Sequence, residues 1–271
     1  MNAPQLRARK RRRGGAPLVM ITAYDEPTAR YADAAGVDLL LVGDSLANVV
    51  LGHDDALRVS VADMVHHTAA VAAATPSAMI VADMPWLSYH GTPAAAVANA
   101  GALIRAGAQA VKLEGGANRS EVIRAILNAE IPVVGHLGLT PQSVLAMGGF
   151  KVQAKTSDAA DQLVAEALIL QDLGVCAIVI EGVPAAVGTR VTEALDIPTI
   201  GIGAGADTDG QVLVLHDILG LTKRTPPKFV RRYADVGALI TQAVAAYADD
   251  VKSGAFPSAS ETYPTPETFG H

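Results

Sequence analysis

The sequence predicts a single-domain (β/α)8 TIM barrel, because strand-like and helix-like segments alternate along most of its 271 residues. Most of the strand-like runs are almost entirely apolar, as parallel strands covered on both faces should be. Four of these runs end on a carboxylate, at Asp44, Asp83, Glu114 and Glu181. In a parallel barrel the carboxyl ends of all strands share one mouth, where the chemistry of such folds lies.

Eight short strands account for the apolar runs. We expect them near residues 18–22, 38–42, 78–83, 110–114, 132–136, 177–181, 198–201 and 212–215. Alanine-rich segments of helical period separate most of them, at residues 27–35, 61–74, 93–106, 120–129, 158–173 and 185–195. The link that contains Thr208 and Asp209 is too short for a full helix before the eighth strand. A doubly wound open sheet is the alternative arrangement.

The predicted barrel domain covers residues 16–257, with a basic arm at 1–15 and a flexible tail at 258–271. Residues 7–13 hold six basic side chains, which we interpret as a solvated arm or a short helix. A signal peptide is the weaker alternative, because the apolar stretch that follows is short and no cleavage site follows it. The tail is rich in Pro, Ser, Thr and Glu, a composition that favours disorder.

Composition excludes several classes of partner. A net charge of −6 and a pI near 5.6 argue against nucleic-acid binding, which needs a basic face. No apolar run approaches the roughly 18 residues of a membrane span. The single cysteine, Cys176, lies in a predicted buried strand and cannot form an internal disulfide, which favours a reducing cytoplasm. A small-molecule substrate therefore fits best.

Strand alternation predicts how the charged side chains lie. Lys112 and Glu114 point to the same face of one strand, near its carboxyl end, and His136 ends the next. So many acids at one rim require a cation, and oxygen ligands without a cysteine pair indicate Mg²⁺ or a similar hard ion rather than zinc. One acid then remains for proton transfer. We favour Glu181, because burial at the end of an apolar strand would make it a stronger base.

Two residues beside the acids allow more than one interpretation. Lys112 could form a Schiff base with a keto substrate, or it could stay an ammonium and bind a substrate carboxylate. We favour the ammonium because Glu114 neighbours it, and a purely structural ion pair is the third alternative. Ser45 follows Asp44 directly, so its amide and hydroxyl could reach an oxyanion, although ordinary turn chemistry also explains a serine there.

Several long motifs closely resemble the ketopantoate hydroxymethyltransferase family. They are TAYD (22–25), LLVGDSLANVVLGHDD (40–55), VADMP (81–85), AVKLEGG (110–116), GHLGLTPQSV (135–144), GGFKVQ (148–153) and IPTIGIGAGADTDGQVLVLHD (197–217). The resemblance implies a (β/α)8 barrel that transfers a one-carbon unit from 5,10-methylenetetrahydrofolate to 3-methyl-2-oxobutanoate, forming 2-dehydropantoate for pantothenate synthesis. It also implies a cytoplasmic homo-oligomer, commonly a decamer.

The same resemblance implies a role for each motif residue. Glu181 would be the catalytic proton acceptor. The expected Mg²⁺ ligands are Asp44, Asp83 and Glu114, the last as a direct or a more distant contributor. The expected contacts of the 2-oxo acid are Asp44, Ser45, Asp83, Lys112 and His136.

The chain departs from the family pattern at a few positions. Ala154 and Lys155 stand where we expect glycine and arginine, and lysine lacks the planar fork of arginine. Gly188 weakens the helix expected at 185–195. Two rival functions stay open: a lyase of the phosphoenolpyruvate mutase and isocitrate lyase type, and a non-catalytic barrel that binds an oxo acid. The lyase would need a cysteine in a catalytic loop, whereas Cys176 lies within a predicted strand.

Overall fold

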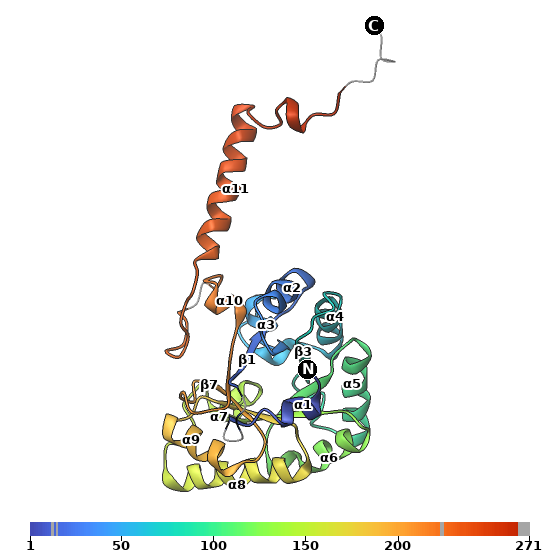
Figure 1. Ribbon diagram of the computed structural model, residues 1–271, viewed down its shortest axis with the longest axis vertical. Coiled ribbons are helices and arrows are strands. Elements are labelled where there is room, and N and C mark those ends of the chain that lie inside the picture. Colours follow the sequence, from blue (N-terminus) through green and yellow to red (C-terminus); the bar gives the residue numbers. More distant parts are fainter. Residues whose placement is uncertain (12–13, 15, 223–224, 265–271) are drawn as a thin grey trace. The chain divides into compact units, whose positions relative to one another are not determined.

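The computed structural model describes residues 1–11, 14, 16–222 and 225–264, and its centre is a closed barrel of parallel strands (Figure 1). The strands are β1 (Leu18–Thr22), β2 (Leu39–Val42), β3 (Met79–Asp83), β4 (Ala110–Glu114), β5 (Val133–Gly138), β6 (Ala177–Glu181), β7 (Thr199–Ile202) and β8 (Gly210–Leu213). Each strand pairs with the next, and β8 pairs with β1. Closure confirms the predicted (β/α)8 barrel and excludes the open sheet.

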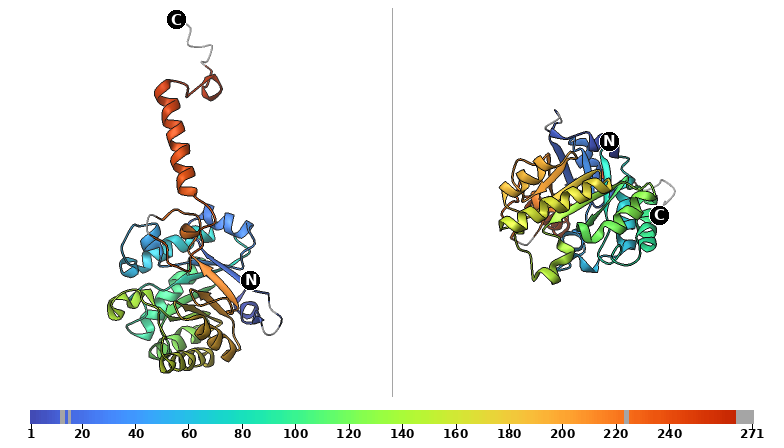
Figure 2. Two further views of the ribbon diagram at one scale, coloured as in Figure 1. Left: turned by 90° about the vertical axis from the view of Figure 1, so that its left-hand side faces the viewer. Right: turned by 90° about the horizontal axis from the view of Figure 1, so that it is seen from below.

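Six helices surround the strands, as the view from below shows (Figure 2). They are α2 (Glu26–Ala34), α4 (Val61–Ala72), α5 (Pro93–Arg105), α6 (Ser120–Asn128), α8 (Ser157–Leu173) and α9 (Ala185–Ala194). Polar N-cap side chains begin four of them by accepting a backbone N–H, namely Asp25, Ser60, Thr92 and Thr156. Shorter helices α3 (Leu46–Val49) and α7 (Val144–Met147) lie in loops. The link between β7 and β8 holds no helix, as expected.

Alternate side chains of the strands fill the barrel interior. Inward-facing pairs such as Leu39 and Leu41 on β2, or Met79 and Val81 on β3, belong to one buried apolar cluster. Leu6 of the short helix α1 (Ala3–Arg7) is fully buried in the same cluster, so the N-terminal helix covers part of the barrel core. The same inward rows continue toward the carboxyl ends of the strands, where they become polar.

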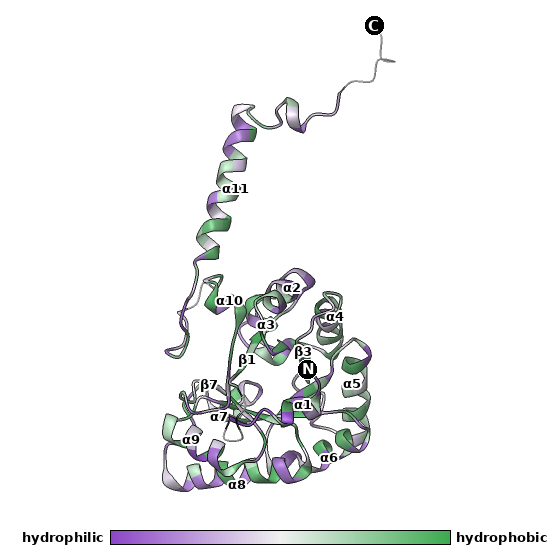
Figure 3. Ribbon diagram, viewed as in Figure 1, coloured by the Kyte–Doolittle hydropathy of each residue, from purple (hydrophilic) through white to green (hydrophobic). Residues whose placement is uncertain are grey.

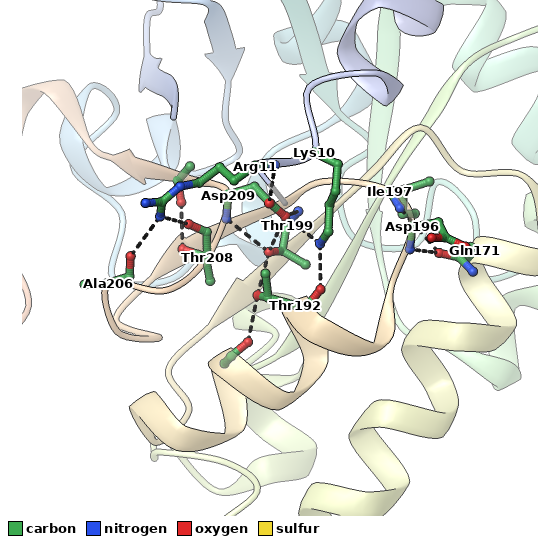
Figure 4. A network of polar contacts seen from close by, with 12 residues as sticks. Lys10, Arg11, Gln171, Thr192, Asp196, Ile197, Thr199, Ala206, Thr208 and Asp209 are labelled. Carbon is green, nitrogen blue, oxygen red and sulfur yellow. Dashed lines mark hydrogen bonds and ion pairs between the residues drawn. The ribbon is translucent and has the colours of Figure 1, made fainter. Parts of the chain in front are cut away.

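The N-terminal arm is not solvated along its length, which corrects one prediction. Lys10 is 1% exposed, and its Nζ donates to Asp209 Oδ2 at 2.8 Å and to the Thr192 carbonyl at 2.6 Å (Figure 4). The backbone N–H of Arg11 donates to the other oxygen of Asp209 at 2.9 Å. The basic cluster therefore includes a buried ion pair at the N-terminal ends of β7 and β8. The short helix α1 (Ala3–Arg7) ends at the first residue of the cluster, so it does not account for the basic side chains that follow, and Arg12 and Arg13 lie outside the described residues.

The chain divides into two compact units, the barrel unit of residues 1–215 and 227–230 and a second unit of residues 216–226 and 231–271. The second unit contains the C-terminal helix. Its main element is α11 (Val236–Ser253), which has apolar side chains at helical spacing, at Ile240, Val244, Tyr247 and Val251. Figure 3 shows hydrophobic and hydrophilic stretches alternating along this helix. The Phe256 ring packs against Tyr247 at a centroid distance of 5.4 Å. Residues 259–261 form a 3-10 turn. Residues 265–271 of the predicted flexible tail lie outside the described residues.

None of the described helices combines the length and apolarity that crossing a membrane requires.

Candidate active site

The barrel brings the predicted charged residues together at the carboxyl ends of neighbouring strands. Asp83, Glu114 and Glu181 each end a strand, on the same face as the apolar core residues of that strand. Lys112 lies opposite Asp83 in the pairing of β3 with β4, and His136 lies opposite Glu114 in the pairing of β4 with β5. All of these side chains except that of Glu181 are nearly inaccessible to solvent. The prediction that Lys112 and Glu114 share a face is confirmed by their common contact with His136.

Asp83 forms the centre of the first half of the site. Its Oδ1 lies 3.0 Å from Lys112 Nζ, and its Oδ2 accepts the backbone N–H of Asp44 at 3.0 Å. Burial raises the pKa of Asp83 to about 6. The Lys112 ammonium partly offsets this increase, whereas the charge of Asp44 adds to it. Burial alone would lower the pKa of Lys112, but the charges of Asp83, Asp44 and Glu114 outweigh it and raise that pKa well above its usual value. Lys112 is therefore an ammonium in this site.

A histidine joins two glutamates in the second half of the site. His136 Nδ1 lies 3.3 Å from Glu114 Oε1, and its Nε2 lies 3.1 Å from Glu181 Oε2. Burial and the nearby Lys112 oppose the charged imidazole, but hydrogen bonds to Glu114 and Glu181 outweigh them and raise the pKa of His136 to about 9. At neutral pH the imidazolium lies between the two carboxylates as their counter-ion and holds the Glu181 side chain in place.

Ser45 is the first residue after Asp44, directly before α3. Its Oγ lies 2.8 Å from the hydroxyl of Tyr24, which is buried at the end of β1. A Cβ atom at Gly43 would lie 2.8 Å from Ser45 Oγ and 3.6 Å from Asp83 Oδ2. Glycine at this position thus lets the Ser45 hydroxyl approach the acids.

Gln142 is a site residue that the sequence reasoning missed. It is buried in the loop after β5, where its Nε2 donates to Asp44 Oδ2 at 2.8 Å and its backbone N–H donates to Glu114 Oε2 at 3.0 Å. The Tyr89 hydroxyl donates to its Oε1 at 2.6 Å. An uncharged amide in a loop carries no sequence signal of such contacts, although Gln142 lies within the GLTPQSV motif.

Two carboxylates in the site fit a hard divalent cation. Burial raises the pKa of Asp44, and the nearby Glu114 adds to the effect, so both Asp44 and Asp83 carry charges that a cation would stabilise. In the described part of the chain, no group of three His, Cys, Asp or Glu side chains is arranged to enclose a metal ion. Mg²⁺ commonly takes only one or two carboxylates and completes its shell with water and substrate. Both oxygens of Glu114 already face donors, which are His136 Nδ1 and the backbone N–H of Gln142. Glu114 is therefore better suited to support the metal ligands than to bind the metal directly.

Cys176 lies at the opposite end of the barrel from these acids. It directly precedes β6 and is buried, with its Sγ 3.2 Å from the Val133 carbonyl. Burial raises the pKa of its thiol to about 12. This is the environment of a packing residue and not of the loop nucleophile that a lyase would need.

Ala154, which replaces an expected glycine, adopts a left-handed backbone with φ of +52°. Glycine reaches this region without strain, which gives a physical reason for the glycine that we expected at this position.

Known proteins resemble this chain closely in sequence. The sequence model of the family described as ketopantoate hydroxymethyltransferase matches residues 1–259. The 3-methyl-2-oxobutanoate hydroxymethyltransferase 2 of Bradyrhizobium diazoefficiens is 54% identical over 257 residues, which are 95% of this chain and 88% of that protein. The 3-methyl-2-oxobutanoate hydroxymethyltransferase of Pyrobaculum arsenaticum is also 54% identical, over 91% of this chain and 93% of that protein.

Solved structures share the fold at much lower identity. A 2,3-dimethylmalate lyase of the PEP mutase and isocitrate lyase superfamily aligns with a TM-score of 0.60 and 18% identity, over 97% of this chain and 91% of that one. A phosphonopyruvate hydrolase in complex with oxalate and Mg²⁺ aligns with a TM-score of 0.61 and 16% identity, over 96% and 93% of the two chains. These likenesses concern the barrel fold alone.

Proposed function

Because the chain belongs to the ketopantoate hydroxymethyltransferase family, we propose that it transfers a one-carbon unit from 5,10-methylenetetrahydrofolate to 3-methyl-2-oxobutanoate in a Mg²⁺-dependent reaction. Membership makes the chain a hydroxymethyltransferase of pantothenate synthesis. In the proposed reaction C3 of the oxo acid loses a proton and forms a carbon–carbon bond to the methylene carbon. Water supplies the hydroxyl group, and the products are 2-dehydropantoate and tetrahydrofolate.

The accessibility of Glu181 is the observation that carries this proposal. Its side chain is 15% exposed, whereas those of Asp83 and Glu114 are 4% and 3% exposed. Glu181 is therefore the strand-end glutamate that a substrate in the barrel mouth can reach. Its Oε2 is held by His136 at 3.1 Å, which leaves Oε1 to take the C3 proton.

The other residues bind the oxo acid and favour the charge that develops on it. The Lys112 ammonium is suited to the substrate carboxylate, and the Ser45 hydroxyl is a further donor beside it. Bound between Asp44, Asp83 and the substrate, Mg²⁺ would polarise the 2-oxo group and stabilise negative charge on its oxygen. The positive charge of His136 beside Glu181 adds to the electrostatic stabilisation at this end of the site.

The proposal takes three further features from the family: 5,10-methylenetetrahydrofolate as the one-carbon donor, a homodecameric assembly and a cytoplasmic location. Sedimentation of the native protein checks the assembly. A decamer has ten times the 27.8 kDa mass of one chain, and a monomeric particle would contradict this part of the proposal.

Exchange of the C3 proton in D₂O tests the chemistry without folate. NMR follows the proton of 3-methyl-2-oxobutanoate in the presence of enzyme, with Mg²⁺ or with EDTA. We expect exchange that requires Mg²⁺ and falls by about 10²- to 10⁴-fold in Glu181→Gln, the usual range for removal of a general base.

Glu121→Gln is the matched control, because Glu121 is an exposed glutamate in the first turn of α6. This variant should exchange the proton at the wild-type rate. Unchanged exchange in Glu181→Gln would exclude Glu181 as the base. A folded wild type that shows no exchange with Mg²⁺ would contradict the proposed enolisation of this substrate without folate.

A further inference from the structure

We propose that Gln142 is a positioning residue that orients the Asp44 carboxylate toward the metal, an inference that rests on the proposed Mg²⁺-dependent function. Gln142 lies in the 3-10 turn Pro141–Ser143 after β5 and is 4% exposed. Its side-chain amide and its backbone N–H both contact acids of the site. Among the described residues, no charged residue of the site donates hydrogen bonds to both Asp44 and Glu114, as Gln142 does.

The surroundings of the Gln142 amide permit one orientation. The Nε2 faces Asp44 Oδ2 at 2.8 Å and the Met84 carbonyl at 3.0 Å. A backbone carbonyl can only accept, so the amide nitrogen must lie on this side. The Oε1 accepts from the Tyr89 hydroxyl at 2.6 Å. That hydroxyl in turn accepts the Glu114 backbone N–H at 3.2 Å, which directs its own proton to Gln142.

This orientation has a direct consequence for both acids. Asp44 Oδ2 is tied to an amide that can only donate to it, which leaves Oδ1 to a cation. The Gln142 backbone N–H holds Glu114 Oε2 at 3.0 Å, while Glu114 Oε1 faces His136 Nδ1 at 3.3 Å. One residue thus separates the roles of two buried carboxylates, with Asp44 presented to the metal and Glu114 turned toward the histidine.

Gln142→Met tests the role of the amide, because methionine has a similar length and keeps the backbone N–H to Glu114. Isothermal titration of the folded, metal-depleted protein measures Mg²⁺ affinity independently of turnover. We expect the affinity to fall about 10- to 100-fold, the usual cost of losing a partner of a metal ligand. Metal-dependent C3 proton exchange should fall at low Mg²⁺ and recover when Mg²⁺ is raised.

Tyr89→Phe provides a second variant that removes only one hydroxyl, the donor to Gln142 Oε1. This variant alone should also weaken Mg²⁺ binding, so it carries the test if Gln142→Met does not fold, and wild-type affinity in Tyr89→Phe would then contradict the role of Gln142. Because Tyr89 acts on the metal through Gln142, the double variant should bind Mg²⁺ no more weakly than Gln142→Met alone. If the losses of Mg²⁺ binding free energy in the two single variants add up in the double variant, Tyr89 does not act through Gln142.

Gln109→Met is the matched structural control. Gln109 Oε1 accepts the Ile80 N–H at 3.0 Å, directly before β4 and at the other end of the barrel from the acids. This variant should keep wild-type Mg²⁺ affinity. Wild-type affinity in Gln142→Met, with Mg²⁺-dependent exchange intact in the wild type, would overturn the role of Gln142 alone. A folded wild type that binds no Mg²⁺ in the titration would overturn the proposed Mg²⁺-dependent function and this inference together.

Discussion

The charge state of Lys112 decides between two kinds of chemistry in this site. A neutral amine could attack the 2-oxo group, whereas an ammonium can only bind and stabilise anions. The Lys112 Nζ lies 3.0 Å from Asp83 Oδ1, and the surrounding carboxylates raise its pKa above the usual value although burial opposes them. The geometry therefore favours the ammonium.

We predict that borohydride does not trap a covalent adduct between Lys112 and 3-methyl-2-oxobutanoate. The ammonium has no lone pair with which to form a Schiff base, so the protein should keep its mass after incubation with substrate and reductant. Intact-mass spectrometry measures this directly, with a Schiff-base aldolase treated in parallel as the positive control. A substrate-sized mass gain that maps to Lys112 would show that the lysine is nucleophilic.

Individual residues differ in how far the sequence can identify them. The acids could be predicted because a charge at the end of an apolar run is visible in the sequence, as at Asp83 and Glu181. Gln142 and Tyr24 could not, since neither is charged and each lies far along the chain from its partner. Tyr24 meets Ser45, and Gln142 meets Asp44, only after the strands are paired in the barrel.

At the scale of elements, a glycine within α9 has a packing reason. The sequence suggested that Gly188 would weaken this helix, yet α9 extends from Ala185 to Ala194. A Cβ atom at Gly188 would lie 2.1 Å from the Ala204 carbonyl oxygen, in the loop after β7. The helix accepts a residue of low propensity because only glycine allows this loop to approach so closely.

We predict that Gly188→Ala destabilises the protein by about 1–3 kcal/mol, because the added methyl forces α9 and the loop apart. Gly101→Ala is the matched control on α5, where a Cβ would meet only the flexible end of Arg105 at 3.4 Å. That change should stabilise the helix by about 0.5–1 kcal/mol. Urea unfolding at one protein concentration compares the two, and equal effects would contradict the packing argument.

The strands and helices that the sequence predicts begin and end within two residues of the observed ones, because apolar runs and glycine breaks mark them. The eighth strand shows the limit of such signals, because both of its ends are displaced by two residues. We expected residues 212–215, but β8 spans Gly210–Leu213 because Gly210 pairs with Leu18 when the barrel closes. A Cβ at Gly210 would lie 2.5 Å from the Leu18 carbonyl oxygen. This register depends on a strand nearly 200 residues away, which local periodicity does not record.

At the scale of the whole barrel, the N-terminal arm is joined to the last two strands. Asp209 receives both the Lys10 ammonium and the Arg11 backbone N–H, and it also accepts the Thr199 N–H at 2.8 Å at the start of β7. The arm looked solvated in the sequence because these partners lie far along the chain, with Asp209 199 residues after Lys10. Figure 4 shows how the contacts converge on one carboxylate.

We predict that Lys10→Met lowers the free energy of unfolding by about 3–5 kcal/mol, since it leaves the buried Asp209 carboxylate without its cation. Arg9→Met is the neighbouring control, because the ion pair of Arg9 with Asp38 is partly exposed and should contribute less than about 1 kcal/mol. Urea unfolding of the barrel, followed by circular dichroism, measures both variants. If both variants lose a similar, small free energy of unfolding, the arm stabilises the barrel through the packing of Leu6 alone. If only Lys10→Met loses a large free energy of unfolding, the buried ion pair stabilises the contact between the start of the chain and the last two strands of the barrel.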